Sequence, residues 1–150
     1  MDEVQNYRPI AITCHVSKIF ERSIHEQVLS YLQIRNMLTP DQSAYLKEHS
    51  TSTSLHKVTD DWLQTMDDGD FTLICLLDIE KCFNSIDHSI LLSKLKFYGI
   101  DEQEWFSNYL LDRKQYVLFN NVESSVETIN IGIPQGSVLG PLLFLVYAND

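Results

Sequence analysis

The chain has 150 residues, and 44% of them are hydrophobic, which is enough for a domain with a buried core. Its 11 basic and 21 acidic residues give a formal net charge of −10, and this opposes tight nucleic-acid binding by the chain alone, because such binding depends on neutralising phosphates. No secretory signal is visible, and the longest late apolar run, 138–148, is shorter than the ~20 residues of a membrane span.

The three cysteines, Cys14, Cys75 and Cys82, are odd in number and lack the spacing of a metal site. They indicate reduced, buried thiols in an intracellular protein. We expect the protein to be nuclear or cytoplasmic and to have no membrane partner. No repeat or linker divides the sequence, so we expect residues 1–150 to form one domain or part of one.

Two early segments carry apolar residues at helical spacing. The first covers residues 16–32, and Thr13 or Ser17 could cap its start. The second covers residues 55–66 and ends at Gly69. We therefore expect two amphipathic helices in the first half of the chain.

Residues 71–77 form a nearly unbroken apolar run that ends in Asp78. A run of this length and composition is typical of a strand buried on both faces. Asp87 then suits the N-cap of a helix over 88–98, and Gly99 suits the position just after its end.

Another helix is expected to start at Asp101 and to run toward Leu111. Residues 116–119 and 126–131 have strand character, and the asparagines at 120–121 favour a hairpin turn between them.

Gly140-Pro141 opens a last apolar helix, because proline is tolerated in the first helical turn. The order of elements is two helices, a strand, two helices, a hairpin, a loop and a helix. This order indicates an α+β fold with an antiparallel element.

The segment 132–144, with the sequence GIPQGSVLGPLLF, contains three glycines, two prolines and a single glutamine. Glycine costs conformational entropy and proline removes a hydrogen-bond donor, so a packing segment rarely needs so many of them. A simple strand-to-helix connector explains one glycine and one proline, but not the whole run. A loop that lets another molecule approach its backbone explains the run better.

The segment 132–144 resembles the motif B loop of reverse transcriptases. Residues 77–88, LDIEKCFNSIDH, look like motif A of the same family, and the segments 6–10 and 17–21 are similar to the opening of polymerases from non-LTR (LINE-type) retrotransposons. Intron-encoded polymerases share motifs A and B, but the opening segment at 6–10 and the residue sequence of 136–144 favour the non-LTR group. The resemblance implies the fingers and amino-terminal palm of a right-hand polymerase, with packed helices on an antiparallel palm sheet, truncated before motif C.

The resemblance assigns Asp78 as the motif A metal ligand, with the backbone carbonyl of Ile79 as a second oxygen. Mg²⁺ prefers such oxygen ligands, and two of these ions can support an in-line phosphoryl transfer. The implied reaction adds a deoxynucleotide to the 3′-hydroxyl of a DNA primer on an RNA template. The competing interpretation is an aspartate that only caps a turn at the end of a strand.

Phe83 lies five residues after Asp78, where the family places a ring that excludes the ribose 2′-hydroxyl, although a core phenylalanine is the simpler alternative. Gln135 and Gly136 are implied to contact the incoming nucleotide, since an amide both donates and accepts hydrogen bonds. Asn84 departs from the family, which commonly has aspartate there.

Residues 42–51 resemble the fingers motif imperfectly, because Leu46 stands where the family usually has an arginine that holds triphosphate. Lys47 could partly substitute as a point charge, and Arg8 is a second candidate for a phosphate or template contact. For both, an exposed surface cation is an equally good interpretation.

The resemblance also places three residues of the motif B loop near template or primer: Gly132, Pro134 and Ser137. Ser137 is expected to act either as a contact or as a helix cap.

Motif C, an aromatic-x-Asp-Asp turn, does not occur before the last residue, Asp150. Residues 147–150 resemble it superficially, but they lie in the predicted last helix with no strand before them. We therefore expect no polymerase activity and weak nucleic-acid binding from this chain as written. The alternative is a non-catalytic remnant that binds protein or RNA.

Overall fold

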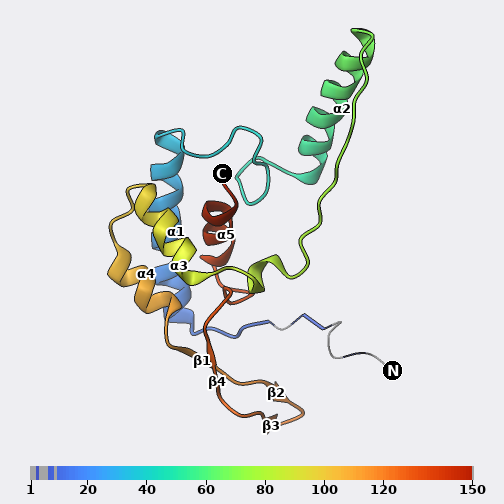
Figure 1. The fold of residues 1–150 in the computed structure, drawn as a ribbon. Helices are drawn as coiled ribbons and strands as arrows, with labels where there is room; N and C mark the ends of the chain where they lie inside the picture. The colour runs from blue at the N-terminus through green and yellow to red at the C-terminus, as the bar shows by residue number, and fades with distance from the viewer. Residues whose placement is uncertain (1–2, 4–6, 9, 150) are drawn as a thin grey trace. The chain divides into compact units, whose positions relative to one another are not determined.

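The computed structural model describes residues 3, 7–8 and 10–149, and it confirms a mixed α+β fold (Figure 1). The elements, in chain order, are α1 (His15–Ile34), α2 (Thr51–Asp67), a short 3₁₀ helix η2 (Cys82–Asn84), α3 (His88–Phe97), α4 (Gln103–Leu110), β1 (Arg113–Gln115), β2 (Leu118–Phe119), β3 (Val122–Glu123), β4 (Glu127–Ile129) and α5 (Gly140–Ala148). The chain divides into a larger unit, residues 1–38 and 81–150, and a smaller unit, residues 39–80.

The core of the larger unit forms where α3 packs against both α4 and α5. Burial of apolar surface stabilises this arrangement by roughly 25 cal/mol for each Å² removed from water. The buried apolar residues of this core are Leu32, Ile86, Leu91, Leu95, Ile100, Phe106, Leu110, Ile133, Leu139, Leu142, Leu143 and Val146.

Helix α5 begins at Gly140 with Pro141 in its first turn, which confirms the predicted last helix. Nearly all of its residues are apolar, and most of them are buried in the core of the larger unit. None of the described helices is both long and apolar enough to cross a membrane.

Helix α3 has the ends that the sequence predicts. The carboxylate of Asp87 accepts hydrogen bonds from the backbone amides of Ser89, at 2.8 Å, and Ile90, at 3.0 Å. Gly99, at a φ of +76°, follows the last residues of the helix. Both positions were identifiable because caps depend on residues only a few positions apart.

The predicted caps of α1 and α4 are wrong. Cys14 precedes α1 without a side-chain cap, and the Ser17 hydroxyl donates instead to Glu21, at 3.0 Å. Helix α4 starts after Glu102 rather than Asp101, again without a side-chain cap. Both helices form because of their apolar faces, which is where most helical stability in proteins arises.

The predicted hairpin turn at 120–121 is confirmed, but the predicted pairing of 116–119 with 126–131 is wrong, because the strand across the turn is β3. β2 pairs with β3 around Asn120 and Asn121, whose φ values of +48° and +62° give the left-handed turn that favours hairpins. β1, which the sequence did not predict, pairs with β4 in antiparallel register. Between the β1–β4 and β2–β3 pairs, the Ser124 hydroxyl accepts a hydrogen bond from the Val117 amide at 2.9 Å. This side-chain bond takes the place of a backbone hydrogen bond between strands.

In the smaller unit, helix α2 starts with a capping box. The Ser50 hydroxyl accepts from the Thr53 amide at 3.1 Å, and the Thr53 hydroxyl accepts from the Ser50 amide at 2.9 Å. Lys57 contacts Asp41 at 2.7 Å in an exposed ion pair. The helix ends before Gly69, as predicted.

The predicted buried strand over residues 71–77 is wrong. These residues follow α2 as an irregular segment, and Phe71 and Leu73 are 100% and 98% exposed. A strand needs a neighbour for its backbone hydrogen bonds, and no other described part of the chain pairs with this segment. Cys75 in this segment and Cys14 are exposed free thiols, so the expected burial of these cysteines is also wrong.

We predict that Asp87→Asn makes the free energy of unfolding depend less on pH in the acid range. Hydrogen bonds from the Ser89 hydroxyl, first, and from the Ile90 amide hold the pKa of Asp87 below its ordinary value of 3.8. The resulting stabilisation is present above that ordinary value and is lost as the pH falls through the lower pKa of the folded state. Urea unfolding between about pH 2 and pH 7 should therefore show the wild type losing its advantage over Asp87→Asn in acid. Asp101→Asn, at another exposed aspartate, is the control, and an equal effect there would contradict the assignment.

Candidate functional site

The turn 81–88 and the loop 131–139 are joined by short hydrogen bonds. The Gly132 amide donates to the Ile86 carbonyl, and the Ile133 amide donates to the Phe83 carbonyl, both at 2.8 Å. Nε2 of the buried His88 lies 2.7 Å from the Gly132 carbonyl oxygen. The part of the motif A segment that lies in the larger unit, residues 81–88, and the segment that resembles motif B therefore form one packed junction.

Gly132 is required by this junction. Its φ is +86°, and a Cβ built there would lie 2.9 Å from both Cα and the carbonyl oxygen of Asn84. These are backbone atoms, which cannot move aside like the end of a flexible side chain. The close packing of loop against turn thus accounts for this glycine without any bound molecule.

Gln135 and Gly136 contact two other parts of the larger unit. The Gln135 side-chain amide donates to Oδ1 of Asn84 at 3.1 Å, and the Ala11 amide donates to the Gln135 carbonyl at 2.7 Å. Gly136 has a φ of +99°, and a Cβ there would lie 3.2 Å from the Ala11 carbonyl oxygen. The opening segment at 10–11 thus crosses the loop where the nucleotide contact is predicted.

Phe83 is half-buried in the junction. Its ring centroid lies 5.0 Å from that of Phe144 in α5, with the ring planes inclined at 35°. This contact fixes the ring beside the core. The position is compatible with both interpretations of Phe83 made from the sequence.

Ser137 is hydrogen-bonded within the loop and to the start of α5. It is 7% exposed, and its hydroxyl donates to the Pro134 carbonyl at 2.9 Å and accepts from the Gly140 amide at 3.0 Å. The N-cap position of α5 is Leu139, which has no side-chain cap, so Ser137 bonds the first amide of the helix from outside the cap position, and its contact with template or primer stays a prediction. Pro134 itself is half-buried in the same loop.

Glu21 is a site residue that the sequence reasoning missed. It is 1% exposed, and its Oε2 accepts from the amides of Val138, at 2.7 Å, and Leu139, at 3.1 Å. The sequence feature that could have identified Glu21 is its position: it is an acidic residue on the apolar face of α1, four residues after Ser17 and three before Ile24.

Tyr109 in α4 shares the surroundings of Glu21 and Ser137. Burial, first, raises the pKa of Tyr109, and the negative charge of Glu21 raises it further, while Ser137 opposes the shift. Glu21 itself is only 1% exposed, and this shielding from water strengthens its hydrogen bonds to the loop.

The remaining predicted site residues are exposed. Asp78 and Ile79 lie in the irregular segment of the smaller unit, and Lys47 lies in the turns before α2. Arg8 is an exposed residue of the larger unit, whereas Asn6, Pro9 and Asp150, named in the sequence motifs, lie outside the described residues.

The Asp78 carboxylate and the Ile79 carbonyl are oxygen donors of the kind that Mg²⁺ takes. In the described part of the chain, no group of three or more His, Cys, Asp or Glu residues could hold a metal ion. Two oxygen donors still fit Mg²⁺, because this ion commonly keeps several waters and completes its coordination with substrate phosphates.

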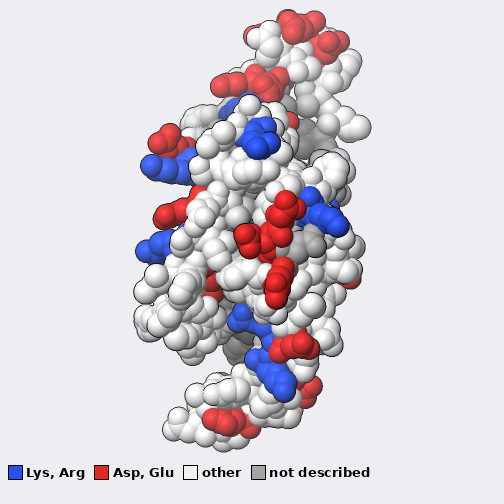
Figure 2. Space-filling view, turned by 90° about the vertical axis from the view of Figure 1, so that its left-hand side faces the viewer, with Lys and Arg blue, Asp and Glu red and all other residues white. Residues whose placement is uncertain are grey.

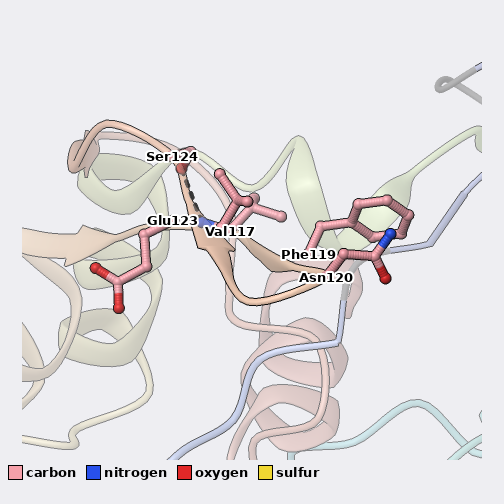
Figure 3. Close-up of a pocket in the computed structure, with 6 residues that line it drawn as sticks. Val117, Phe119, Asn120, Glu123 and Ser124 are labelled. Carbon is pink, nitrogen blue, oxygen red and sulfur yellow. Dashed lines mark hydrogen bonds between the residues drawn. The ribbon is translucent and has the colours of Figure 1, made fainter.

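The described pocket lies elsewhere, as a hollow of about 410 Å³ against the β2–β3 hairpin (Figure 3). Its lining residues are Val117, Phe119, Asn120, Val122, Glu123 and Ser124. None of the predicted site residues lines it. On the face that Figure 2 shows, lysine and arginine side chains are scattered among acidic ones.

Comparison with known proteins gives a consistent family. Residues 2–150 match the family model described as reverse transcriptase (RNA-dependent DNA polymerase). The chain is 33% identical, over 97% of its length, to a probable RNA-directed DNA polymerase from transposon BS of Drosophila melanogaster. It is 31% identical, over 99% of its length, both to the probable polymerase of the X-element and to the polymerase of the mobile element jockey from the same species. The chain spans 16% of the length of each of these relatives, and no solved structure matches it.

We predict that Gly132→Ala destabilises the larger unit well beyond the usual cost of alanine at positive φ. That conformational cost is about 1–2 kcal/mol, and overpacking against the Asn84 backbone adds about 1–3 kcal/mol. Gly69→Ala is the matched control, because Gly69 has a φ of +83° and a Cβ there would meet nothing within 4 Å. Equal losses in the free energy of unfolding for the two variants would contradict the packing argument.

Proposed function

Because the chain belongs to the reverse transcriptase (RNA-dependent DNA polymerase) family, we propose that it forms the fingers and the amino-terminal palm of a non-LTR retroelement polymerase. The observation that carries this proposal is the match over residues 2–150. It is supported by the packing of residues 81–88, the second part of the motif A segment, against the motif B loop. The polypeptide would extend a DNA 3′-hydroxyl on an RNA template with deoxynucleoside triphosphates.

In this proposal, Asp78 and the Ile79 carbonyl hold Mg²⁺. When bound, Mg²⁺ supplies charge stabilisation to the attacking and departing oxygens of the transferred phosphoryl group. Asp78 would contribute a carboxylate oxygen to the metal. The supporting observation is chemical: both donors are oxygens, and Asp78 is exposed to solvent.

The incoming nucleotide would contact Phe83, Gln135 and Gly136, with Lys47 near its phosphates. The Phe83 ring, held by Phe144, would exclude a ribose 2′-hydroxyl by its bulk. The Gln135 amide, oriented by Asn84, would donate or accept hydrogen bonds without demanding one base.

Template and primer would lie near Arg8, Gly132, Pro134 and Ser137. The formal net charge of −10 makes the affinity of this chain alone for nucleic acid low, because few phosphates can be neutralised. The RNA template and DNA primer would then depend on basic surface elsewhere in the polypeptide.

The test is primer extension on poly(rA)/oligo(dT) by the whole reading frame that encodes this chain, because a second carboxylate cluster is needed beside Asp78. We predict that Asp78→Ala lowers the extension rate by roughly three orders of magnitude or more, as loss of a metal ligand should. Asp70→Ala removes another exposed aspartate from the smaller unit and should leave the rate unchanged. Normal extension by Asp78→Ala would overturn the metal assignment.

A second candidate function is a non-catalytic binding module, and the exposed apolar segment 71–77 favours it. An extended apolar segment without a paired neighbour can add to a strand of another chain. The occupant we consider is a second copy of this chain.

This second function predicts association that depends on concentration and on the segment. Sedimentation of the wild-type chain should show dimers or larger species, and Leu76→Lys should shift the population toward monomers. Leu55→Lys, at an exposed leucine of α2, is the control. A wild-type monomer at all concentrations would exclude this function.

A further inference from the structure

Glu21 is a buried acidic residue that has no assigned role in the proposed reaction. Its Oε2 accepts from the amides of Val138 and Leu139, and its Oε1 accepts from the Ser17 hydroxyl, at 3.0 Å. A buried carboxylate is costly unless its oxygens are satisfied, and these three bonds satisfy it. A side chain in α1 thereby fixes the end of the loop 131–139 at the start of α5.

The other end of the loop is fixed by the turn 81–88. The amides of Gly132 and Ile133 donate to that turn, at 2.8 Å each. Gln135 and Gly136 lie between these two attachments. Their position therefore depends on Glu21 at one end as much as on the turn at the other.

The contact between Glu21 and the two loop amides depends on the length of the Glu21 side chain. One methylene fewer would withdraw the carboxylate from the two amides, and these would be left without a partner beside α5. Small displacements of groups that contact a substrate lower rates strongly, by up to about 100-fold for a shift of 1 Å.

We propose that Glu21 is a positioning residue for nucleotide selection, which holds Gln135 and Gly136 where the incoming deoxynucleotide binds. This inference rests on the proposed function. It assigns to α1 a role in the proposed reaction, although Glu21 contacts neither nucleotide nor metal.

Hydrogen exchange of the 150-residue chain tests the structural part. In Glu21→Ala, the amides of Val138 and Leu139 should exchange faster by about 10- to 100-fold, as loss of a bond to a charged acceptor predicts. The Leu143 amide, bonded to the Leu139 carbonyl within α5 at 3.0 Å, is the internal reference. Ser17→Ala removes only the bond to Oε1 and should change neither loop amide by more than about threefold.

Primer extension by the whole reading frame tests the functional part. Glu21→Asp should lower kcat/KM for the deoxynucleotide by about 10- to 100-fold, while the Kd for primer–template stays as in the wild type. Glu21→Gln keeps an oxygen for the two amides and an amide group for Ser17, so it should retain kcat/KM within about threefold. This pair still decides the question if Glu21→Ala fails to fold.

Four results would contradict the inference or a part of it. Unchanged exchange at both loop amides in Glu21→Ala or Glu21→Asp would show that the carboxylate does not hold the loop. An unchanged kcat/KM in Glu21→Asp, with an active wild type, would refute the functional role alone. Equal losses of kcat/KM in Glu21→Gln and Glu21→Asp would refute the dependence on side-chain length. A wild-type polypeptide that extends no primer would instead overturn the proposed function, and this inference with it.

Discussion

The loop 131–139 depends on one constraint, which is that its buried backbone amides must all find acceptors. The turn 81–88 supplies carbonyls to the amides of Gly132 and Ile133, and the Pro134 carbonyl serves Ser137. At the far end the carboxylate of Glu21 accepts from the amides of Val138 and Leu139. These acceptors join α1, the turn and the start of α5 within the larger unit.

The same constraint changes the meaning of the glycines in this loop. Their number first suggested a backbone that another molecule approaches. The structure shows that the approaching groups are Asn84 at Gly132 and Ala11 at Gly136, both within the chain. Glycine at these positions is therefore needed for folding whether or not nucleotide binds. Gln135 differs, because its side-chain amide meets only a partly exposed neighbour, Asn84, and it is the stronger candidate for substrate contact.

Local signals in the sequence predicted most helices and failed where partners are distant. Asp87 and Gly99 mark the ends of α3 because capping involves residues a few positions apart. The run 71–77 has strand composition, but a strand also requires a paired neighbour, and composition does not supply one. Glu21 was missed because its acceptor role joins residues 117 and 118 positions apart. The sequence pattern pointed to the residues of the loop 131–139, but it did not show the contacts within the chain that hold them in position.

These differences divide the proposed active site into two parts with different requirements. The nucleotide side, with Phe83 and Gln135, rests on a core that is complete in the larger unit. The metal side rests on Asp78, which follows an apolar segment that has no paired strand in the described chain. Exposing that segment costs the hydrophobic free energy that burial would return. In the proposed function, pairing of residues 71–77 with a further strand would bury this surface and would also restrict the backbone next to Asp78, the proposed metal ligand.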